Sequence, residues 1–240
     1  MKEGISIIIP TLNEEKYVGK LLDCLTKQTY KDFEVIVVDG VSDDRTKKIV
    51  KDYKDRLNLK LINSEKRNVS YQRNLGSDRS GFHILLFLDA DVSFDDNFLE
   101  KSLNYINNKN IDIASVRFTP TSKDFPEIFF FNLINVFFSV FQYIKPSYIG
   151  AGLFIKKKIF VSSGKFNEKL TFAEDLEFIR RAHKLKKFRI LPYYVIFSTR
   201  RFDKLGSRNM IQAWIKTFIK HLLNKETPKP QFYDHVGGNL

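Results

Sequence analysis

The feature that most constrains the fold is an alternation, in the first half of the chain, of short β-branched runs with stretches of helical period. The expected strands are Ile5–Ile9, Phe33–Val38, Leu57–Ile62, Ile84–Leu88 and Ile111–Val116. The expected helices between them are Glu14–Leu25, Asp43–Tyr53, Tyr71–Arg79 and Asp95–Ile106. This α/β pattern predicts βαβ units and a Rossmann-like, mixed but mostly parallel sheet flanked by helices.

The second half of the chain is less regular. A long aromatic helix and a later helix with acidic residues at its start are expected, and two further strands. In chain order these elements are Phe125–Ile144 (helix), Ser147–Ile155 (strand, interrupted at Gly150-Ala151-Gly152), Phe172–Leu185 (helix) and Phe188–Thr199 (strand). An amphipathic helix, Ser207–Leu223, precedes the tail. The sequence contains no internal repeat and no clear linker, so we expect a single domain with a C-terminal amphipathic helix.

Composition excludes several classes of protein. With 43% hydrophobic and 14% aromatic residues among 240, the chain can bury a substantial core. A single cysteine, Cys24, rules out a disulfide framework and fits a reducing compartment. The start runs directly into a strand-like segment, and no run approaches the roughly 20 apolar residues of a spanning helix. We therefore expect a cytoplasmic protein without a cleavable signal peptide.

The charge is distributed unevenly between the two halves. The net charge of +12 divides into −1 for residues 1–144 and +13 for residues 145–240. Such an asymmetry points to an anionic partner that the C-terminal part contacts.

Acidic and polar residues follow three of the predicted strands. These segments are Pro10-Thr11-Leu12-Asn13-Glu14-Glu15, Asp39-Gly40-Val41-Ser42-Asp43-Asp44, and Asp89-Ala90-Asp91. Ligands of parallel sheets bind beyond the carboxyl ends of the strands, where these residues should gather. Clustered carboxylates there suit a divalent cation, which usually brings substrate phosphates. The alternative is that each residue forms a turn or a helix N-cap, where Asp, Asn and Ser are favoured anyway.

At this point the sequence resembles a known family. Ser6-Ile-Ile-Ile-Pro-Thr-Leu-Asn-Glu-Glu15, Val38-Asp39-Gly-x-Ser-Asp-Asp44, Arg73-Asn74-x-Gly76, Phe87-Leu-Asp-Ala-Asp91 and Ala173-Glu-Asp175 occur in this order. Together they resemble the inverting family-two glycosyltransferases of the GT-A fold, including the dolichyl-phosphate-mannose-synthase-like and polyprenyl glycosyltransferase group. The resemblance implies a domain over residues 1–205, with a nucleotide-binding half (1–117) and an acceptor half (118–205), followed by the helix and tail of 206–240.

The resemblance also implies a nucleoside-diphosphate sugar as donor. Asp39 would accept from the base, with Thr11 and Glu14 near base and ribose, and Asp89 would approach the ribose. Asp91 would bind Mg²⁺ or Mn²⁺ bridging the diphosphate, where the cation stabilises the leaving group as charge develops on it. The donor-binding set implied in this way is Pro10, Thr11, Glu14, Asp39, Arg73, Asp89, Ala90, Gly152, Arg200 and Arg201.

The second half would supply the acceptor chemistry. In the family reading Asp175 is the general base that deprotonates the acceptor hydroxyl, and Glu174 binds the acceptor or orients the base. Both residues would equally complement the dipole of a helix N-terminus. Gly152 would let the backbone approach the sugar, or simply bend a strand. Arg200 and Arg201 match the basic pair that can clamp the diphosphate.

The sequence departs from the family pattern at two places. None of its histidines, His83, His183, His221 and His235, falls where some relatives have a third metal ligand. Protein ligation of the cation would then rest on Asp91 alone. Gly164-Lys165-Phe166 stands where two glycines usually precede the aromatic residue, which bears only on loop shape.

Two helices leave the membrane question open. Ile128–Ile144 has no charged residue, and its polar members Asn132, Asn135, Ser139 and Gln142 form one narrow stripe. On Ser207–Leu223, Trp214 and several aliphatic residues share one face, with Lys216 and Lys220 off it. The first helix could be buried against the sheet, lie in a bilayer interface or line a groove for a lipid tail. The second could pack in the core or be an interfacial anchor on an anionic membrane surface, on the inner face of the cell membrane.

Three functions compete at this stage. The first is a metal-dependent glycosyltransferase acting on a sugar or lipid-linked acceptor. A variant of it is a polyprenyl-phosphate sugar synthase, whose ionised phosphate acceptor needs no general base. A nucleic-acid-binding module would fit the pI of about 9.6, but its motifs are missing and the carboxylates would repel a phosphate backbone, so we expect no nucleic-acid partner. A nucleotidyltransferase would need a Gly-rich basic loop after the first strand, which Pro10–Glu15 lacks.

Overall fold

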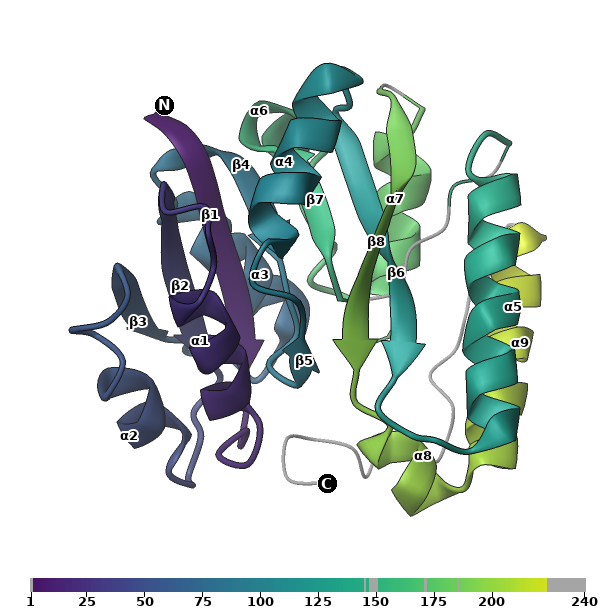
Figure 1. Ribbon diagram of the computed structural model, residues 1–240, viewed down its shortest axis with the longest axis horizontal. Coiled ribbons are helices and arrows are strands. Elements are labelled where there is room, and N and C mark those ends of the chain that lie inside the picture. Colours follow the sequence, from purple (N-terminus) through teal and green to yellow (C-terminus); the bar gives the residue numbers. More distant parts are fainter. Residues whose placement is uncertain (1, 145, 147–150, 171, 185, 224–240) are drawn as a thin grey trace.

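The computed structural model describes residues 2–144, 146, 151–170, 172–184 and 186–223 (Figure 1). The strands are β1 (Lys2–Thr11), β2 (Phe33–Asp39), β3 (Leu59–Asn63), β4 (Phe82–Phe87), β5 (Val92–Ser93), β6 (Ile113–Pro120), β7 (Leu153–Lys156) and β8 (Phe188–Phe197). The helices are α1 (Val18–Thr26), α2 (Thr46–Lys51), α3 (Val69–Asp78), α4 (Phe98–Asn108), α5 (Phe125–Phe141), α6 (Lys157–Ser162), α7 (Glu174–Ala182), α8 (Arg200–Leu205) and α9 (Ser207–Leu222).

The strands form one sheet in the order β3-β2-β1-β4-β7-β6-β8-β5. The N-terminal strands β1 to β4 pair in parallel, and β6 also pairs in parallel with β8. β7 lies antiparallel between β4 and β6, and β5 pairs antiparallel with β8. The expected mixed sheet flanked by helices is confirmed.

Burial on both faces explains why β1 is a run of isoleucines. Ile7 and Ile9 join the cluster that includes α1 and α4, whereas Ile8 packs in the cluster of α6 and α7. All three side chains are fully buried, as in the central strand of a covered parallel sheet. Figure 1 shows α1 and α4 in front of the sheet, α6 and α7 behind it, and α5 with α9 along one flank.

Several helices begin later than their hydrophobic period predicts. The expected helix Glu14–Leu25 starts at Val18, because the N–H groups of Glu14 and Glu15 donate to Thr46 Oγ1 and Asp44 Oδ2. The expected Asp43–Tyr53 starts at Thr46, whose N–H donates to Asp44 Oδ1. Side chains of Asp44 and Thr46, in the segment after β2, thus accept from the amides of Glu14, Glu15 and Thr46. Both helices begin only after these bonds.

The strand expected over Ser147–Ile155, with its interruption at Gly150-Ala151-Gly152, is confirmed beyond that interruption. β7 begins at Leu153, and residues 147–150 lie outside the described residues. Gly152 has a φ of +101°, and a Cβ there would lie 2.5 Å from Val116 Cγ2 on β6. The glycine therefore precedes the strand and allows the chain to pass close to β6. The elements β5, α6 and α8 had no expected counterpart.

No helix in the described part of the chain combines the length and the apolar character needed to cross a bilayer.

Because α3 packs closely on β1 at Gly76, we expect a larger side chain at this position to destabilise the protein. A Cβ at this position would meet Ile8 Cγ2 at 2.5 Å, inside the fully buried core. Gly76→Ala should lower the free energy of unfolding by about 1–3 kcal/mol through overpacking. Urea unfolding measures this change.

Gly19→Ala is the matched control, because Gly19 is also helical and its Cβ would meet Ile49 only at an ordinary 3.6 Å. This substitution should be neutral or stabilise the protein by up to about 1 kcal/mol. Equal stability of the two variants would contradict the packing described.

Candidate active site

Side-chain contacts tie the loops after β1 and β2 into one unit. Asn13 N donates to Ser42 Oγ at 2.8 Å, and Asp43 N donates to Asn13 Oδ1 at 3.0 Å. The turn explanation therefore describes Ser42 well, and also Asp44, which accepts from backbone amides of both loops. Val41 between them has a φ of 66°, a strained value for a β-branched residue.

Asp39 lies at the base of these loops and is fully buried. Its Oδ2 accepts from Ser42 N at 2.9 Å, and its Oδ1 accepts from Thr11 Oγ1 at 3.3 Å. Gln72 of α3 bonds the ends of both strands, because its Nε2 donates to the carbonyls of Thr11 on β1 and Val38 on β2 at 2.9 and 2.7 Å. The ends of β1 and β2 are thus fixed relative to α3.

Arg200 joins two of the predicted site carboxylates. Its Nη1 and Nη2 each donate to a carboxylate oxygen of Glu14 at 2.7 Å, in a bidentate pair. Its Nε lies 3.1 Å from Asp91 Oδ2, and the guanidinium stacks over the Tyr17 ring at 4.3 Å from the centroid. An arginine that follows β8 therefore closes over the ends of β1 and β4.

Burial dominates the titration of these carboxyl groups. It raises the pKa of Glu14 to about 7, and Arg200 opposes this rise. Burial likewise raises the pKa of Asp91, with Arg200 opposing and the nearby Asp89 adding to the rise. Arg201 acts on both groups through its charge, in the same direction as Arg200.

A second arginine, Arg73, joins the end of β4 to the first turn of α7. Its Nη2 donates to Asp89 Oδ1 at 2.8 Å, and its Nη1 donates to Glu174 Oε1 at 2.7 Å. The Arg73 side chain is 3% exposed, so both ion pairs are largely removed from water. The next residue, Asn74, makes three hydrogen bonds to Phe166 and Glu168, which anchors the segment leading to α7.

Asp175 follows Glu174 in the first turn of α7 and is partly exposed. Its Oδ1 accepts from Leu176 N at 2.7 Å. Ala173, which precedes the helix, has a left-handed φ of 57°. This backbone turn brings Glu174 to Arg73, while the acidic first turn also complements the helix dipole. The position of Glu174 and Asp175 therefore fits a role in acceptor chemistry and also a role in complementing the helix dipole.

The structure distributes the predicted residues over three adjoining groups. Glu14, Asp91 and Arg200 form one group, with Arg201 beside it. Arg73, Asp89 and Glu174 form the second, and Thr11 with Asp39 form the third. Ala90 is buried between the two aspartates, Pro10 pairs with Val38 in the sheet, and Gly152 contacts β6.

The residues fit a cation that is shared with a ligand. Within the described ranges no three His, Cys, Asp or Glu side chains lie close enough to form a metal site of their own. Glu14, Asp89, Asp91 and Glu174 nevertheless outnumber the two arginines that contact them. Asp91, with its side chain 7% exposed, would be the one carboxylate ligand, and a ligand's phosphate oxygens would complete the shell.

Sequence reasoning missed Gln72 and Tyr17. Gln72 directly precedes Arg73, and its place one residue before the Arg-Asn pair was the available signal. Tyr17 lies three residues after Glu14, within an expected helix, and nothing in its spacing indicates a contact with Arg200.

Known proteins share sequence and fold with this chain. A family model described as glycosyl transferase family 2 matches residues 6–166. Glycosyltransferase AglE of Haloferax volcanii is 36% identical over 121 residues, which is 48% of this chain and 40% of AglE.

Solved structures are similar over most of the chain. The structure of S. aureus TarS 1–349 in complex with UDP-GlcNAc has a TM-score of 0.68 and 26% identity, covering 82% of this chain and 59% of that one. The mannosyltransferase PcManGT from Pyrobaculum calidifontis, solved with GDP-Man and Mn²⁺, has a TM-score of 0.74 at 19% identity, over 95% of this chain and 66% of that one. The last likeness establishes the fold, and the chain spans less than half the length of AglE.

The raised pKa of Glu14 predicts a pH dependence of stability. Because this pKa is about 7 in the folded chain against an ordinary 4.5, the folded chain keeps a proton that the unfolded chain releases. Its contribution is complete below pH 4.5 and is lost as the pH rises toward 7. Glu14→Gln should lessen this loss by up to about 2 kcal/mol, measured by urea unfolding between pH 5 and pH 7.

Glu34→Gln is the control for this experiment. Lys60, Gly81 and Ser6 bond the Glu34 carboxylate and, against desolvation, hold its pKa below 4.5, so its contribution is lost only at lower pH. Its variant should keep the wild-type slope between pH 5 and pH 7. A Glu14→Gln slope equal to that of the wild type would show that Glu14 does not titrate in this interval.

Proposed function

Because the chain belongs to glycosyl transferase family 2, we propose that it transfers a sugar from a nucleoside-diphosphate sugar to an acceptor, with inversion at the anomeric carbon and with Mg²⁺ or Mn²⁺ on the diphosphate. The observation that carries this proposal is the meeting of Glu14, Asp89, Asp91 and Glu174 with Arg73 and Arg200 at the carboxyl ends of the strands. No packing need explains so many charges there, whereas a cation, a diphosphate and an acceptor hydroxyl would use them.

The nucleoside would lie against the loops after β1 and β2. Asp39 Oδ1 accepts from Thr11 Oγ1 at 3.3 Å, a long hydrogen bond that a donor group of the base could replace. The strained turn at Val41 supports a role for this loop in binding, since backbone strain is usually retained at functional sites. TarS, at 26% identity, was solved with UDP-GlcNAc, and this makes a UDP-sugar the first donor to test.

The diphosphate would lie between Asp91 and the arginines that follow β8. Asp91 would hold the cation, which, when bound, neutralises charge that develops on the leaving nucleoside diphosphate. Arg200 would exchange part of its pairing with Glu14 and Asp91 for the phosphate oxygens, with which guanidinium groups form bidentate bonds. Arg201 would add positive charge next to it.

The acceptor would approach from the side of α7. Its hydroxyl oxygen attacks the anomeric carbon while Asp175 takes the hydroxyl proton, and the bond from the anomeric carbon to the phosphate oxygen breaks. Glu174 is already engaged by Arg73, so we assign it an orienting role and assign the base to Asp175. Since Arg73 also holds Asp89, the donor and acceptor sides would be positioned through one guanidinium group.

Asp175→Asn should lower kcat for a hydroxyl acceptor about 10²- to 10⁴-fold, because the amide cannot accept the proton. Release of nucleoside diphosphate in the presence of acceptor measures this. The matched control is Glu177→Gln, in the same first turn but paired with Arg181, which should retain wild-type turnover. Wild-type turnover in Asp175→Asn would overturn the assignment of the base.

A phosphate acceptor is the second candidate, and the same variant distinguishes it. A polyprenyl phosphate is ionised and needs no base, so Asp175→Asn would then remain active on it. The exposed apolar side chains of α5, such as Leu133 and Val136, are the observation that favours a lipid-linked acceptor, whether its reacting group is a hydroxyl or a phosphate.

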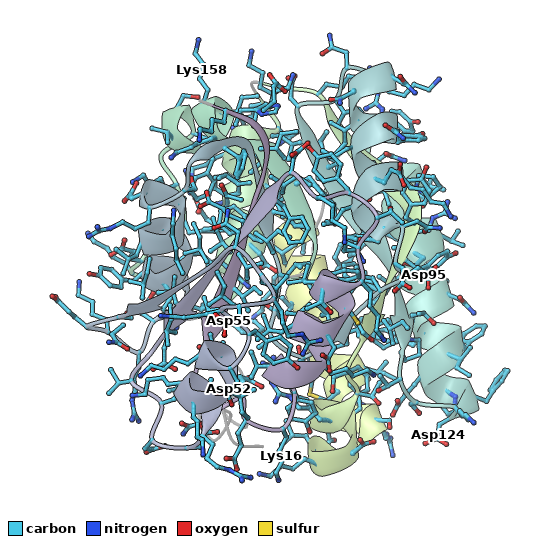
Figure 2. The ribbon with its side chains drawn as sticks, turned by 60° about the vertical axis from the view of Figure 1, so that its left-hand side comes forward. Lys16, Asp52, Asp55, Asp95, Asp124 and Lys158 are labelled. Carbon is cyan, nitrogen blue, oxygen red and sulfur yellow. The ribbon has the colours of Figure 1, made fainter. Side chains whose placement is uncertain are left out.

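Asp91→Asn should remove the response to the cation. In the wild type, chelation of divalent cations should abolish turnover, and added Mn²⁺ should restore it. In the variant, turnover should change neither on chelation nor on addition of Mn²⁺. Manganese bound in the presence of UDP or GDP can also be counted directly by electron paramagnetic resonance. Asp95→Asn, an exposed aspartate four residues further on (Figure 2), is the control and should behave as the wild type. Unchanged manganese binding by Asp91→Asn would contradict the assignment.

A further inference from the structure

Helix α5 carries apolar side chains on two faces, whereas a helix that only packs on a sheet needs them on one. Phe129, Leu133, Val136 and Val140 follow one another at spacings of four, three and four residues, so they share one face. Each of them is more than half exposed, with Val136 at 62%.

Two amides of the polar stripe face the protein, whereas Asn132 of the same stripe is exposed. Asn135 is buried, where its amide donates to Phe118 O at 2.6 Å and accepts from Phe118 N at 2.9 Å. Gln142 Oε1 accepts from Ile190 N at 2.9 Å. The amides therefore satisfy backbone groups of β6 and β8, and an equally long row of apolar residues is left outside.

Helix α9 extends this apolar row. The contacts Glu127 to Ser207, Phe130 to Trp214 and Phe137 to Phe218 advance along both helices together, so α5 and α9 run parallel. With these contacts fixed and both helices also packed on the core, the remaining faces of the two helices point to the same side. Ile215 and Ile219 are 46% and 49% exposed on that face of α9.

We call this surface the α5–α9 face; it comprises Phe129, Leu133, Val136, Val140, Ile215 and Ile219. A contiguous exposed apolar surface of this kind marks an interaction site. Trp214, which the sequence suggested as an interfacial anchor, lies elsewhere, since it packs against Phe130, Phe131, Phe197 and Phe202.

The charges beside the face decide what it contacts. Arg208 and Lys216 are exposed on α9, Lys220 is partly exposed, and the helix contains no acidic residue. The single acidic residue of α5, Glu127, is buried. An isologous contact with a second copy would bring these cations toward their own equivalents, which opposes self-association.

We propose that the α5–α9 face lies on the surface of a lipid bilayer with anionic headgroups. The apolar row enters the boundary between headgroups and acyl chains, and the basic residues of α9 meet the lipid phosphates. Figure 2 places Asp124, directly before α5, and Lys16, in the loop after β1, at the same end of the molecule, with Lys158 at the opposite end. The face therefore extends from the end of the molecule that carries the candidate site.

Vesicle flotation of the full chain tests this proposal without any sugar donor. The wild type should float with vesicles of phosphatidylcholine containing phosphatidylglycerol, and it should float poorly with phosphatidylcholine alone or at high salt. Leu133→Ser combined with Val136→Ser should weaken binding at least about tenfold, because two inserted side chains are lost. Val161→Ser, an equally exposed valine on α6 outside the face, should bind as the wild type.

The charge contribution has its own pair of variants. Lys216→Glu with Lys220→Glu should weaken binding about 30-fold or more. Lys51→Glu with Lys54→Glu, exposed lysines near α2, changes the net charge equally and should have little effect. Equal loss in both pairs would mean that only overall charge matters, and would overturn the assignment of the face.

Three further results would also overturn the proposal. The first is absence of flotation at low salt, and the second is flotation that the Leu133/Val136 variant retains. The third is a wild-type dimer in light scattering that this variant converts to monomer without any vesicle binding, since the face would then join two copies. Thermal unfolding verifies that each variant is folded. Asp91→Asn should float normally, so failure of the proposed reaction and failure of this inference are distinguishable.

Discussion

The structure depends on four carboxylates and two arginines that lie buried or partly buried at one edge of the sheet. Arg73 pairs with Glu174, 101 positions away in the sequence, and Arg200 pairs with Glu14, 186 positions away, so these ion pairs link distant parts of the domain. Removing one partner of such a pair typically costs about 3–5 kcal/mol, because the other charge stays buried without compensation. Replacing the whole set by apolar groups would often cost nothing, which means that stability does not account for it. Its arrangement is explained if the same groups exchange partners with a cation, a diphosphate and an acceptor.

The sequence predicts the sheet and the site residues because both depend on local pattern. Buried β-branched runs such as Ile5–Ile9 identify strands by themselves, and Asp89-Ala90-Asp91 is visible as a motif. The pairing of Arg73 with Glu174, or of Glu14 with Arg200, depends on how distant strands are ordered, and one chain's spacing does not contain this order. Helix starts were misplaced for a related reason, since Asp44 and Thr46 take up amides of a loop about 30 residues away. On α5 the polar stripe was visible, but the direction in which it faces became known only from Asn135 and Phe118.

The excess of positive charge has separate uses that composition cannot distinguish. Arg200 is part of the candidate site, and Lys216 and Lys220 lie beside the α5–α9 face. The run of three lysines at 156–158 is different, because Lys156 pairs with Asp112 at 2.8 Å and Lys157 donates to the carbonyl of Ser80. Lys158 lies at the end of the molecule opposite the site (Figure 2). Part of the basic excess therefore makes contacts within the fold, and Arg200, Lys216 and Lys220 lie at two other places on the molecule.

The central claim is that the edge formed by Asp39, Asp91 and Arg200 binds a nucleoside diphosphate together with a divalent cation. Calorimetric titration of the chain with UDP and with GDP, each with and without Mn²⁺, tests this claim most directly. The account predicts one site per chain, a preference for one of the two bases, and binding that is at least about tenfold tighter with Mn²⁺ than without it. Failure of both nucleotides to bind in the presence of Mn²⁺, or binding that is indifferent to the cation, would contradict it.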